Sequence, residues 1–200
     1  DKGVEYIIKE PELYRDKRIV IAGGGDSALD WTIFLADVAS EVTLVHRRKG
    51  FRGALDSVEK VEELAKTGRV KLITEAQVVG LDGDAEHLRQ VTIKHKHDGD
   101  FQQETDHFIP LFGLSPKLGP IAEWGLSINR SAVEVDTEDY STNVPGIYAV
   151  GDINTYPGKL KLILCGFHEG TLMVQSAFKY IYPDKKVQFK YTTVNGVNAF

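Results

Sequence analysis

The sequence has one cysteine, fewer positive than negative charges and no long hydrophobic run. Its 200 residues include one cysteine, Cys165, which excludes an internal disulfide and the usual structural zinc site. The net charge of -5 argues against nucleic acid as a general partner. No stretch is apolar for long enough to span a bilayer, and residues 1–5 do not resemble a signal peptide. We therefore expect a cytoplasmic protein with no nucleic-acid and no membrane partner.

The clearest pattern is a hydrophobic run that ends in consecutive glycines. Residues 18–22 are typical of a buried strand, and a helical pattern of apolar residues follows the glycines. The spacing Gly23-x-Gly25-x-x-Ala28 matches the dinucleotide fingerprint, with alanine in its third place. Gly23 would permit the tight turn, Gly25 the approach of a pyrophosphate, and Ala28 the packing of the helix on the strand.

The start of this helix is a candidate phosphate site. Asp26 and Ser27 stand at its first positions, where backbone N–H groups are free and the helix dipole is positive. The apolar pattern of the helix continues to Val38. We therefore expect a strand, a glycine turn and a helix to form the core of a nucleotide site.

A second expected strand, residues 41–46, ends beside a cluster of arginines. Arg47 and Arg48 follow His46 directly, and Arg52 comes shortly after. An NAD site usually places a carboxylate here, on the ribose 2′-hydroxyl, whereas guanidinium groups pair bidentately with a 2′-phosphate. We therefore predict NADP(H) as the cofactor. The alternative is that these charges only solvate a surface loop.

The rest of the first half is expected to complete an α/β domain. The patterns predict a helix over 55–66 and strands over 70–73, 76–81, 88–96 and 101–112. The last three strands are expected to form a hairpin or meander inserted into the nucleotide-binding domain. The fold class is thus α/β, a Rossmann-like three-layer (ββα) NAD(P)/FAD-binding domain over residues 1–111.

Residues 112–200 are richer in loops and end in a long apolar helix. Short strands are expected at 133–136 and 147–150, and a helix at 160–182. The second strand ends at Gly151-Asp152, where a carboxylate could accept hydrogen bonds from the hydroxyl groups of a polyol. Alternatively, Asp152 is a helix N-cap or a turn residue.

Three motifs carry a specific resemblance to known proteins. The chain resembles the thioredoxin-reductase-like flavoproteins at Gly-Gly-Gly-Asp-Ser-Ala-Leu-Asp-Trp (23–31), His-Arg-Arg-x-x-Phe-Arg (46–52) and Thr-Asn-Val-Pro-Gly-Ile-Tyr-Ala-Val-Gly-Asp (142–152). Residues 153–159 and Gly166-Phe167-x-Glu169 are similar to the ferredoxin–NADP reductases of this type. The resemblance implies hydride transfer from NADPH to FAD, with ferredoxin or flavodoxin as the electron acceptor. A homodimer is also expected.

The resemblance also implies roles for individual residues. Gly151 and Asp152 would lie against FAD. After the last helix, Tyr191 would stack over the flavin ring, and Thr192 and Thr193 would hydrogen-bond beside it; the alternative for Tyr191 is a surface aromatic in a frayed tail. No catalytic acid, base or metal ligand is expected, because hydride transfer depends on positioning more than on proton transfer.

Two departures from the family limit these implications. The region corresponding to the redox Cys-x-x-Cys, residues 6–13, contains no cysteine, so disulfide reduction is not expected. The family's first FAD-binding βαβ unit, with its own glycine motif, has no counterpart here. We therefore expect a fragment, with residues 112–200 as the C-terminal part of a second, FAD-binding domain. Two alternatives stay open: a flavin-free NADP-binding or sensing module, and another NADPH-dependent flavin oxidoreductase.

Overall fold

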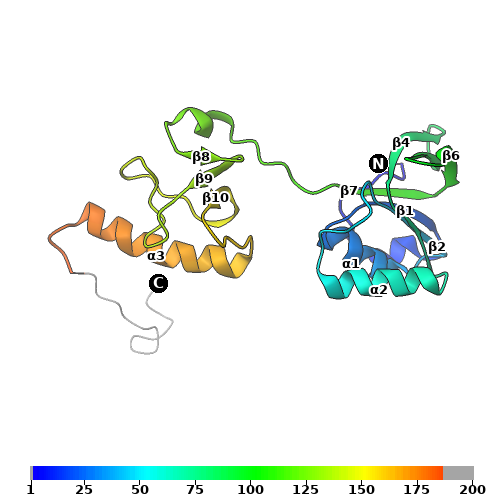
Figure 1. Ribbon diagram of the computed structural model, residues 1–200, viewed down its shortest axis with the longest axis horizontal. Coiled ribbons are helices and arrows are strands. Elements are labelled where there is room, and N and C mark those ends of the chain that lie inside the picture. Colours follow the sequence, from blue (N-terminus) through cyan, green and yellow to red (C-terminus); the bar gives the residue numbers. More distant parts are fainter. Residues whose placement is uncertain (1, 187–200) are drawn as a thin grey trace. The chain divides into compact units, whose positions relative to one another are not determined.

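Two separate units make up the chain, and the computed structural model describes residues 2–186 (Figure 1). Unit 1 is Asp1–Leu114 and unit 2 is Ser115–Phe200. Among the described helices, none combines the length and the hydropathy needed to cross a membrane. Within the same residues, no group of three or more His, Cys, Asp or Glu side chains is arranged to hold a metal ion.

Unit 1 is built from two sheets and two main helices. Its strands are β1 (Arg18–Gly23), β2 (Glu41–Val45), β3 (Val70–Ile73), β4 (Ala76–Gly83), β5 (Leu88–His95), β6 (Gly99–Glu104) and β7 (His107–Leu111). Its helices are η1 (Pro11–Tyr14, a 3-10 helix), α1 (Asp26–Leu35) and α2 (Leu55–Lys66). A parallel sheet has the order β3-β2-β1-β7, and β4-β5-β6 form an antiparallel sheet. Figure 1 shows α1 and α2 on one side of the parallel strands and β4 and β6 on the other.

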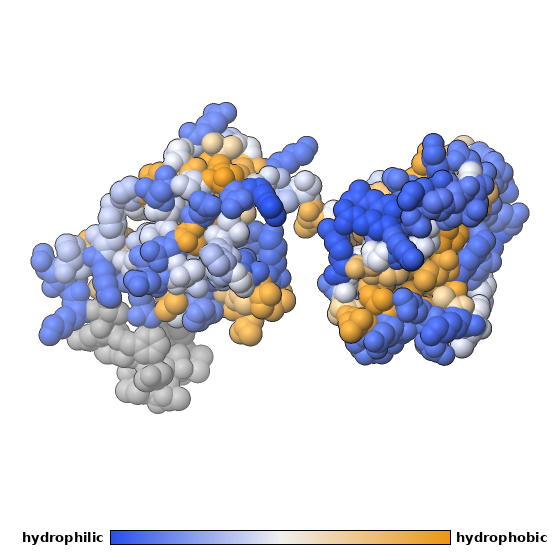
Figure 2. Space-filling model, viewed as in Figure 1, coloured by the Kyte–Doolittle hydropathy of each residue, from blue (hydrophilic) through white to orange (hydrophobic). Residues whose placement is uncertain are grey.

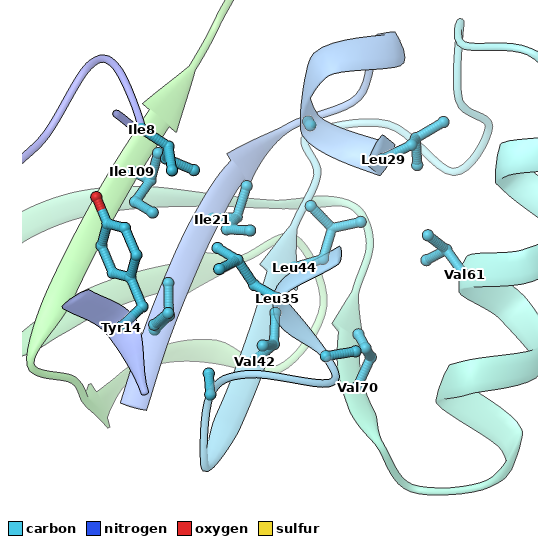
Figure 3. Close-up of a cluster of buried hydrophobic side chains, with 14 residues drawn as sticks. Ile8, Tyr14, Ile21, Leu29, Leu35, Val42, Leu44, Val61, Val70 and Ile109 are labelled. Atoms are coloured by element: carbon cyan, nitrogen blue, oxygen red, sulfur yellow. The ribbon is translucent and has the colours of Figure 1, made fainter. Parts of the chain in front are cut away.

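The alternation of side chains along β1 creates this three-layer arrangement. Ile19 and Ile21 belong to a buried cluster with residues of α1 and α2 (Figure 3). Val20 and Ala22 belong to a second cluster, shared with residues of β4 and β5. Both faces of β1 are therefore covered, which explains its continuous hydrophobic run. The predicted Rossmann-like α/β fold class is confirmed.

The predicted elements of the β1–β3 region form with small changes at their ends. The helix predicted at 55–66 and the strand predicted at 70–73 have those bounds. Helix α1, however, ends at Leu35 and not at Val38. The carbonyl groups of Thr32 and Phe34 accept the N–H groups of Ala36 and Asp37, and the chain turns there toward β2. Val38 still packs, partly buried, against the core, which explains why it fitted the apolar pattern.

The single strand predicted over 101–112 is wrong. Two strands form instead, and they belong to different sheets, β6 to the antiparallel one and β7 to the parallel one. Thr105 and Asp106 break the run because both bond to β1. The Asp106 carboxylate accepts the Arg18 N–H at 2.8 Å, and the Thr105 hydroxyl donates to the Arg18 carbonyl at 3.0 Å.

Unit 2 contains short strands and one long helix. Its elements are η2 (Gly119–Glu123, 3-10), β8 (Ile128–Asn129), β9 (Ala132–Glu134), η3 (Gly151–Ile153, 3-10), β10 (Asn154–Thr155) and α3 (Ile163–Ile181), with strand order β10-β9-β8. The strand predicted at 147–150 does not form. Residues 147–149 hydrogen-bond to the turn at 140–142, over too few residues to build a ladder.

Candidate nucleotide-binding site

A cleft of about 910 Å³ lies in unit 1 at the carboxyl ends of β1, β2 and β7. The strand order reverses here, because the chain continues from β1 to β2 on one side and returns through β7 on the other. Ligands of open α/β sheets bind at such a point. The cleft is lined by Tyr6, residues 22–28, residues 45–47, Arg52, residues 76–78 and residues 110–114.

The glycine turn after β1 has two positions without room for a side chain and one that faces open space. A Cβ on Gly23 would lie 2.6 Å from the Ala28 Cβ and 2.6 Å from the Leu111 carbonyl oxygen. A Cβ on Gly24 would lie 2.1 Å from the His46 ring. On Gly25 a Cβ would meet nothing within 4 Å. Packing thus requires Gly23 and Gly24, while Gly25 leaves space in which a ligand can approach the backbone.

The start of α1 is open toward this cleft. Gly25 is the N-cap residue and no side chain caps the helix, so its first N–H groups are left for a ligand. Ser27 is exposed there. The Asp26 carboxylate accepts the Ala54 N–H at 2.7 Å, so this side chain fastens the loop after β2 to the helix. The geometry is that of a backbone anion site.

The ring of His46 packs against Gly24 of the glycine turn. Its side chain is buried, its ring stacks on Phe51 at 4.8 Å between centroids, and Nε2 lies 3.1 Å from the Gly50 carbonyl oxygen. Burial lowers the pKa of the imidazole, and the charges of Arg47 and Arg48 lower it further, against the hydrogen bonds to backbone carbonyls. The contact with the Gly50 carbonyl requires a proton on Nε2.

The arginines of this loop are exposed and unpaired. Arg47 and Arg52 line the cleft, whereas Arg48 does not. Within residues 2–186, none of the three guanidinium groups forms a hydrogen bond or an ion pair. The Arg52 N–H donates to the Gly24 carbonyl at 2.8 Å, which holds this part of the loop against the glycine turn. Free guanidinium groups beside a backbone anion site can bind a second phosphate.

In unit 2 the predicted Gly151-Asp152 pair forms the turn of η3. Gly151 has φ +77, a conformation that glycine adopts at little cost. Asp152 is exposed, and its carboxylate accepts no hydrogen bond from any described residue. It is not the N-cap of α3, because that position belongs to Leu162. The carboxylate is thus presented outward on a fixed turn.

Glu169 of α3 fixes this turn, a role that the sequence analysis missed. Its carboxylate has no exposed surface and accepts the Gly151 N–H at 2.7 Å, the Asn154 amide at 2.9 Å and the Tyr156 hydroxyl at 2.8 Å, and it also pairs with Lys159. Burial acts to raise the pKa of Glu169, but Lys159 and the other donors outweigh it and lower that pKa. The sequence feature that could have indicated this role is a glutamate within an otherwise apolar helical pattern.

The flavin-covering residues predicted from the resemblance, Tyr191, Thr192 and Thr193, lie outside the described residues. In unit 2, the side-chain oxygen Oδ1 of Asn154 is buried and has no hydrogen-bond partner among the described residues.

Comparison with known proteins identifies the family. A model of the pyridine nucleotide-disulphide oxidoreductases matches residues 3–170. The chain belongs to this family. Among its relatives, ferredoxin–NADP reductase 1 of Christiangramia forsetii is 68% identical over 100% of the chain and 57% of the relative. The ferredoxin–NADP reductase of Flavobacterium johnsoniae is 64% identical, with the same coverage of 100% and 57%.

The solved structures agree with the fold. Lactococcus lactis thioredoxin reductase superposes with a TM-score of 0.76 at 24% identity, and the match covers 91% of this chain and 59% of the reductase chain. The family model and the curated relatives confirm the resemblance predicted from the sequence motifs. The chain spans about 57% of the length of the curated relatives that it matches.

Proposed function

We propose that this chain is the NADP-binding part, and a portion of the FAD-binding part, of an NADPH-dependent flavoprotein that reduces ferredoxin or flavodoxin. The observation that carries the proposal is the cleft of unit 1, where an uncapped helix start and unpaired arginines lie at one switch point of the sheet. The high identity to proteins named ferredoxin–NADP reductase supports ferredoxin as the partner.

In this proposal, each part of NADP(H) has its own contacts in the cleft. The glycine turn and the first N–H groups of α1 bind the pyrophosphate, with Gly25 giving it access. Arg47 and Arg52 bind the 2′-phosphate, and Arg48 adds positive charge from just outside the cleft. His46 holds the turn and the loop together.

We assign FAD to unit 2 in the same proposal. Gly151 and Asp152 are the residues that would hold it, since the turn is fixed by Glu169 and the carboxylate is free to accept hydrogen bonds from hydroxyl groups. FAD, when bound, supplies the centre that accepts a hydride from NADPH. This arrangement favours a flavoprotein over a flavin-free NADP module, because such a module has no use for a presented carboxylate in unit 2. The cytoplasmic location and the homodimer stay predictions.

The test is the cofactor preference of the chain. Isothermal titration with NADP⁺ and NAD⁺ should show tighter binding of NADP⁺. The double variant Arg47→Ala/Arg52→Ala should lose about tenfold or more in NADP⁺ affinity, since each removes a charge-assisted contact, while NAD⁺ affinity stays unchanged.

Two single variants serve as controls. Arg48→Ala should cause a smaller loss, because its side chain does not line the cleft. Arg15→Ala removes a positive charge that pairs with Glu12 at the surface, and it should change neither affinity. Equal affinity of the unchanged chain for NADP⁺ and NAD⁺ would contradict the proposal.

A further inference from the structure

Tyr6 lines the nucleotide cleft at the end away from the arginines. The segment before it runs along β7, with a bridge between Val4 and Phe108. Because β7 and β2 lie on opposite sides of β1, Tyr6 stands across the glycine turn from Arg47 and Arg52. The two ends of the cleft thus differ, one carrying guanidinium groups and the other an aromatic ring.

The backbone around Tyr6 is held in place. The Glu5 N–H donates to the Phe108 carbonyl at 3.0 Å. The Glu5 carboxylate pairs with the Tyr14 hydroxyl and with His107 Nδ1, the latter at 3.0 Å. Ile8, shortly after Tyr6, is buried in the core. The ring of Tyr6 therefore stands on a segment anchored on both sides.

The side chain of Tyr6 is nevertheless left without partners. It is 73% exposed, and its hydroxyl forms no hydrogen bond with any described residue. Exposing a large aromatic surface gains nothing in folding, whereas stacking on a second planar ring would bury it. Pro110, Leu111 and Phe112 line the same end of the cleft and make it apolar.

We propose that Tyr6 packs against the nicotinamide ring of bound NADP(H) and positions it. This inference rests on the proposed function. When the 2′-phosphate lies at Arg47 and Arg52 and the pyrophosphate at the glycine turn, the remaining nicotinamide riboside extends toward β7. Tyr6 there offers a planar surface.

The experiment compares NADP⁺ with 2′,5′-ADP, which has the 2′-phosphate but lacks the nicotinamide riboside. Affinities are measured by isothermal titration for the unchanged chain, Tyr6→Ala, Tyr6→Phe and Ile7→Ala. Tyr6→Ala should weaken NADP⁺ binding about fivefold through the lost stacking, and leave 2′,5′-ADP binding unchanged. Tyr6→Phe keeps the ring and should bind both ligands like the unchanged chain. Ile7→Ala is the matched control, because Ile7 is also exposed but does not line the cleft.

A proton NMR spectrum of bound NADP⁺ gives a second readout. A ring stacked on the nicotinamide shifts its proton resonances upfield, and this shift should disappear in Tyr6→Ala and persist in Tyr6→Phe. No change in NADP⁺ affinity in Tyr6→Ala, or an equal loss for both ligands, would overturn the assignment of Tyr6. Failure of the unchanged chain to bind 2′,5′-ADP would instead overturn the NADP site itself, and the assignment with it.

Discussion

A carboxylate without exposed surface, such as that of Glu169, keeps its charge only through the groups that point at it. Its partners are a backbone N–H, an amide, a hydroxyl and the ammonium group of Lys159, a residue whose side chain is only 7% exposed. Removing one member of a buried ion pair leaves the other uncompensated, which costs more than the pair contributes. Removing the Glu169 carboxylate would thus leave the Lys159 ammonium without its ion-pair partner and the Gly151 N–H without its acceptor.

Glu169→Gln should therefore destabilise unit 2 by about 3–5 kcal/mol at neutral pH. The two tryptophans allow a local measurement, since Trp31 lies in unit 1 and Trp124 in unit 2. Urea unfolding followed by Trp124 fluorescence in a Trp31→Phe background reports the loss. Glu138→Gln, an exposed position of the same unit, is the control and should change little.

The pH dependence of the same variant follows from the lowered pKa of Glu169. A carboxyl group with a lowered pKa in the folded state contributes stability above its unfolded pKa, near 4.5, and loses it as the pH falls through the folded value. Between about pH 5 and pH 3, unit 2 of the unchanged chain should lose more stability than that of Glu169→Gln. Parallel pH profiles of the two proteins would show that folding does not lower the pKa of Glu169.

At the scale of elements, the glycine turn between β1 and α1 separates a folding role from a binding role. A side chain on Gly24 collides with the ring of His46, whereas one on Gly25 enters open space. The backbone of Gly25, with φ -103 and ψ -178, is accessible to alanine. A substitution at Gly24 is therefore expected to lower the stability of unit 1, whereas one at Gly25 is expected to affect ligand binding instead.

Gly24→Ala should lower the free energy of unfolding of unit 1 by about 1–3 kcal/mol, because the new methyl group overpacks the turn. Gly25→Ala should leave this stability within about 1 kcal/mol and reduce NADP⁺ affinity about tenfold, by keeping the pyrophosphate from the backbone. Thermal unfolding followed by Trp31 fluorescence and calorimetric titration measure the two quantities. A destabilised Gly25→Ala with unchanged affinity would contradict the assignment.

The elements that sequence patterns predicted well are those whose signal is local. The run 18–22, the glycines and the amphipathic residues 55–66 each contain their own hydrophobic period and boundary signals. The division at Thr105 and Asp106 escaped prediction because it depends on Arg18, far away in the sequence. The strand expected at 147–150 failed for a different reason, since its nearby partner at 140–142 is too short to form a ladder.

The candidate site shows the same difference between local and distant causes. Gly23, Gly25, Ala28 and the arginines follow from a spacing pattern, and the structure brings all but Arg48 to the cleft. Tyr6, by contrast, reaches the cleft only because the first residues run along β7. No pattern of the linear sequence indicates such a neighbour.

For the whole molecule, the two units differ in how they are stabilised. Among the described residues, both buried hydrophobic clusters lie within residues 1–114, and so does every residue that lines the nucleotide cleft. In unit 2 many apolar side chains of α3 are exposed, among them Ile163, Leu164, Phe167, Val174 and Ile181. Figure 2 shows such hydrophobic side chains on the surface of unit 2 near the beginning of α3. Exposed surface of this kind favours contact with another protein surface.

A polypeptide of residues 1–114 should therefore fold alone and keep the NADP site. Its circular dichroism should show one cooperative thermal transition, and its affinity for 2′,5′-ADP should equal that of residues 1–200 within about twofold. The Arg47→Ala/Arg52→Ala variant of the shorter polypeptide is the control for specific binding. A non-cooperative transition, or loss of binding in the shorter polypeptide, would mean that unit 2 is needed to complete unit 1.

The two-sided burial of β1 restricts how this cleft can change in evolution or by engineering. Inserting or deleting one residue in the strand would exchange the helix-facing and sheet-facing side chains, so the strand tolerates neither. The loop after β2 is joined to the glycine turn by the hydrogen bonds of Arg52 and Ala54 N–H groups, which any amino acid except proline can supply. The cofactor preference can therefore be changed by exchanging side chains in this loop, while the backbone contacts that hold the loop stay the same.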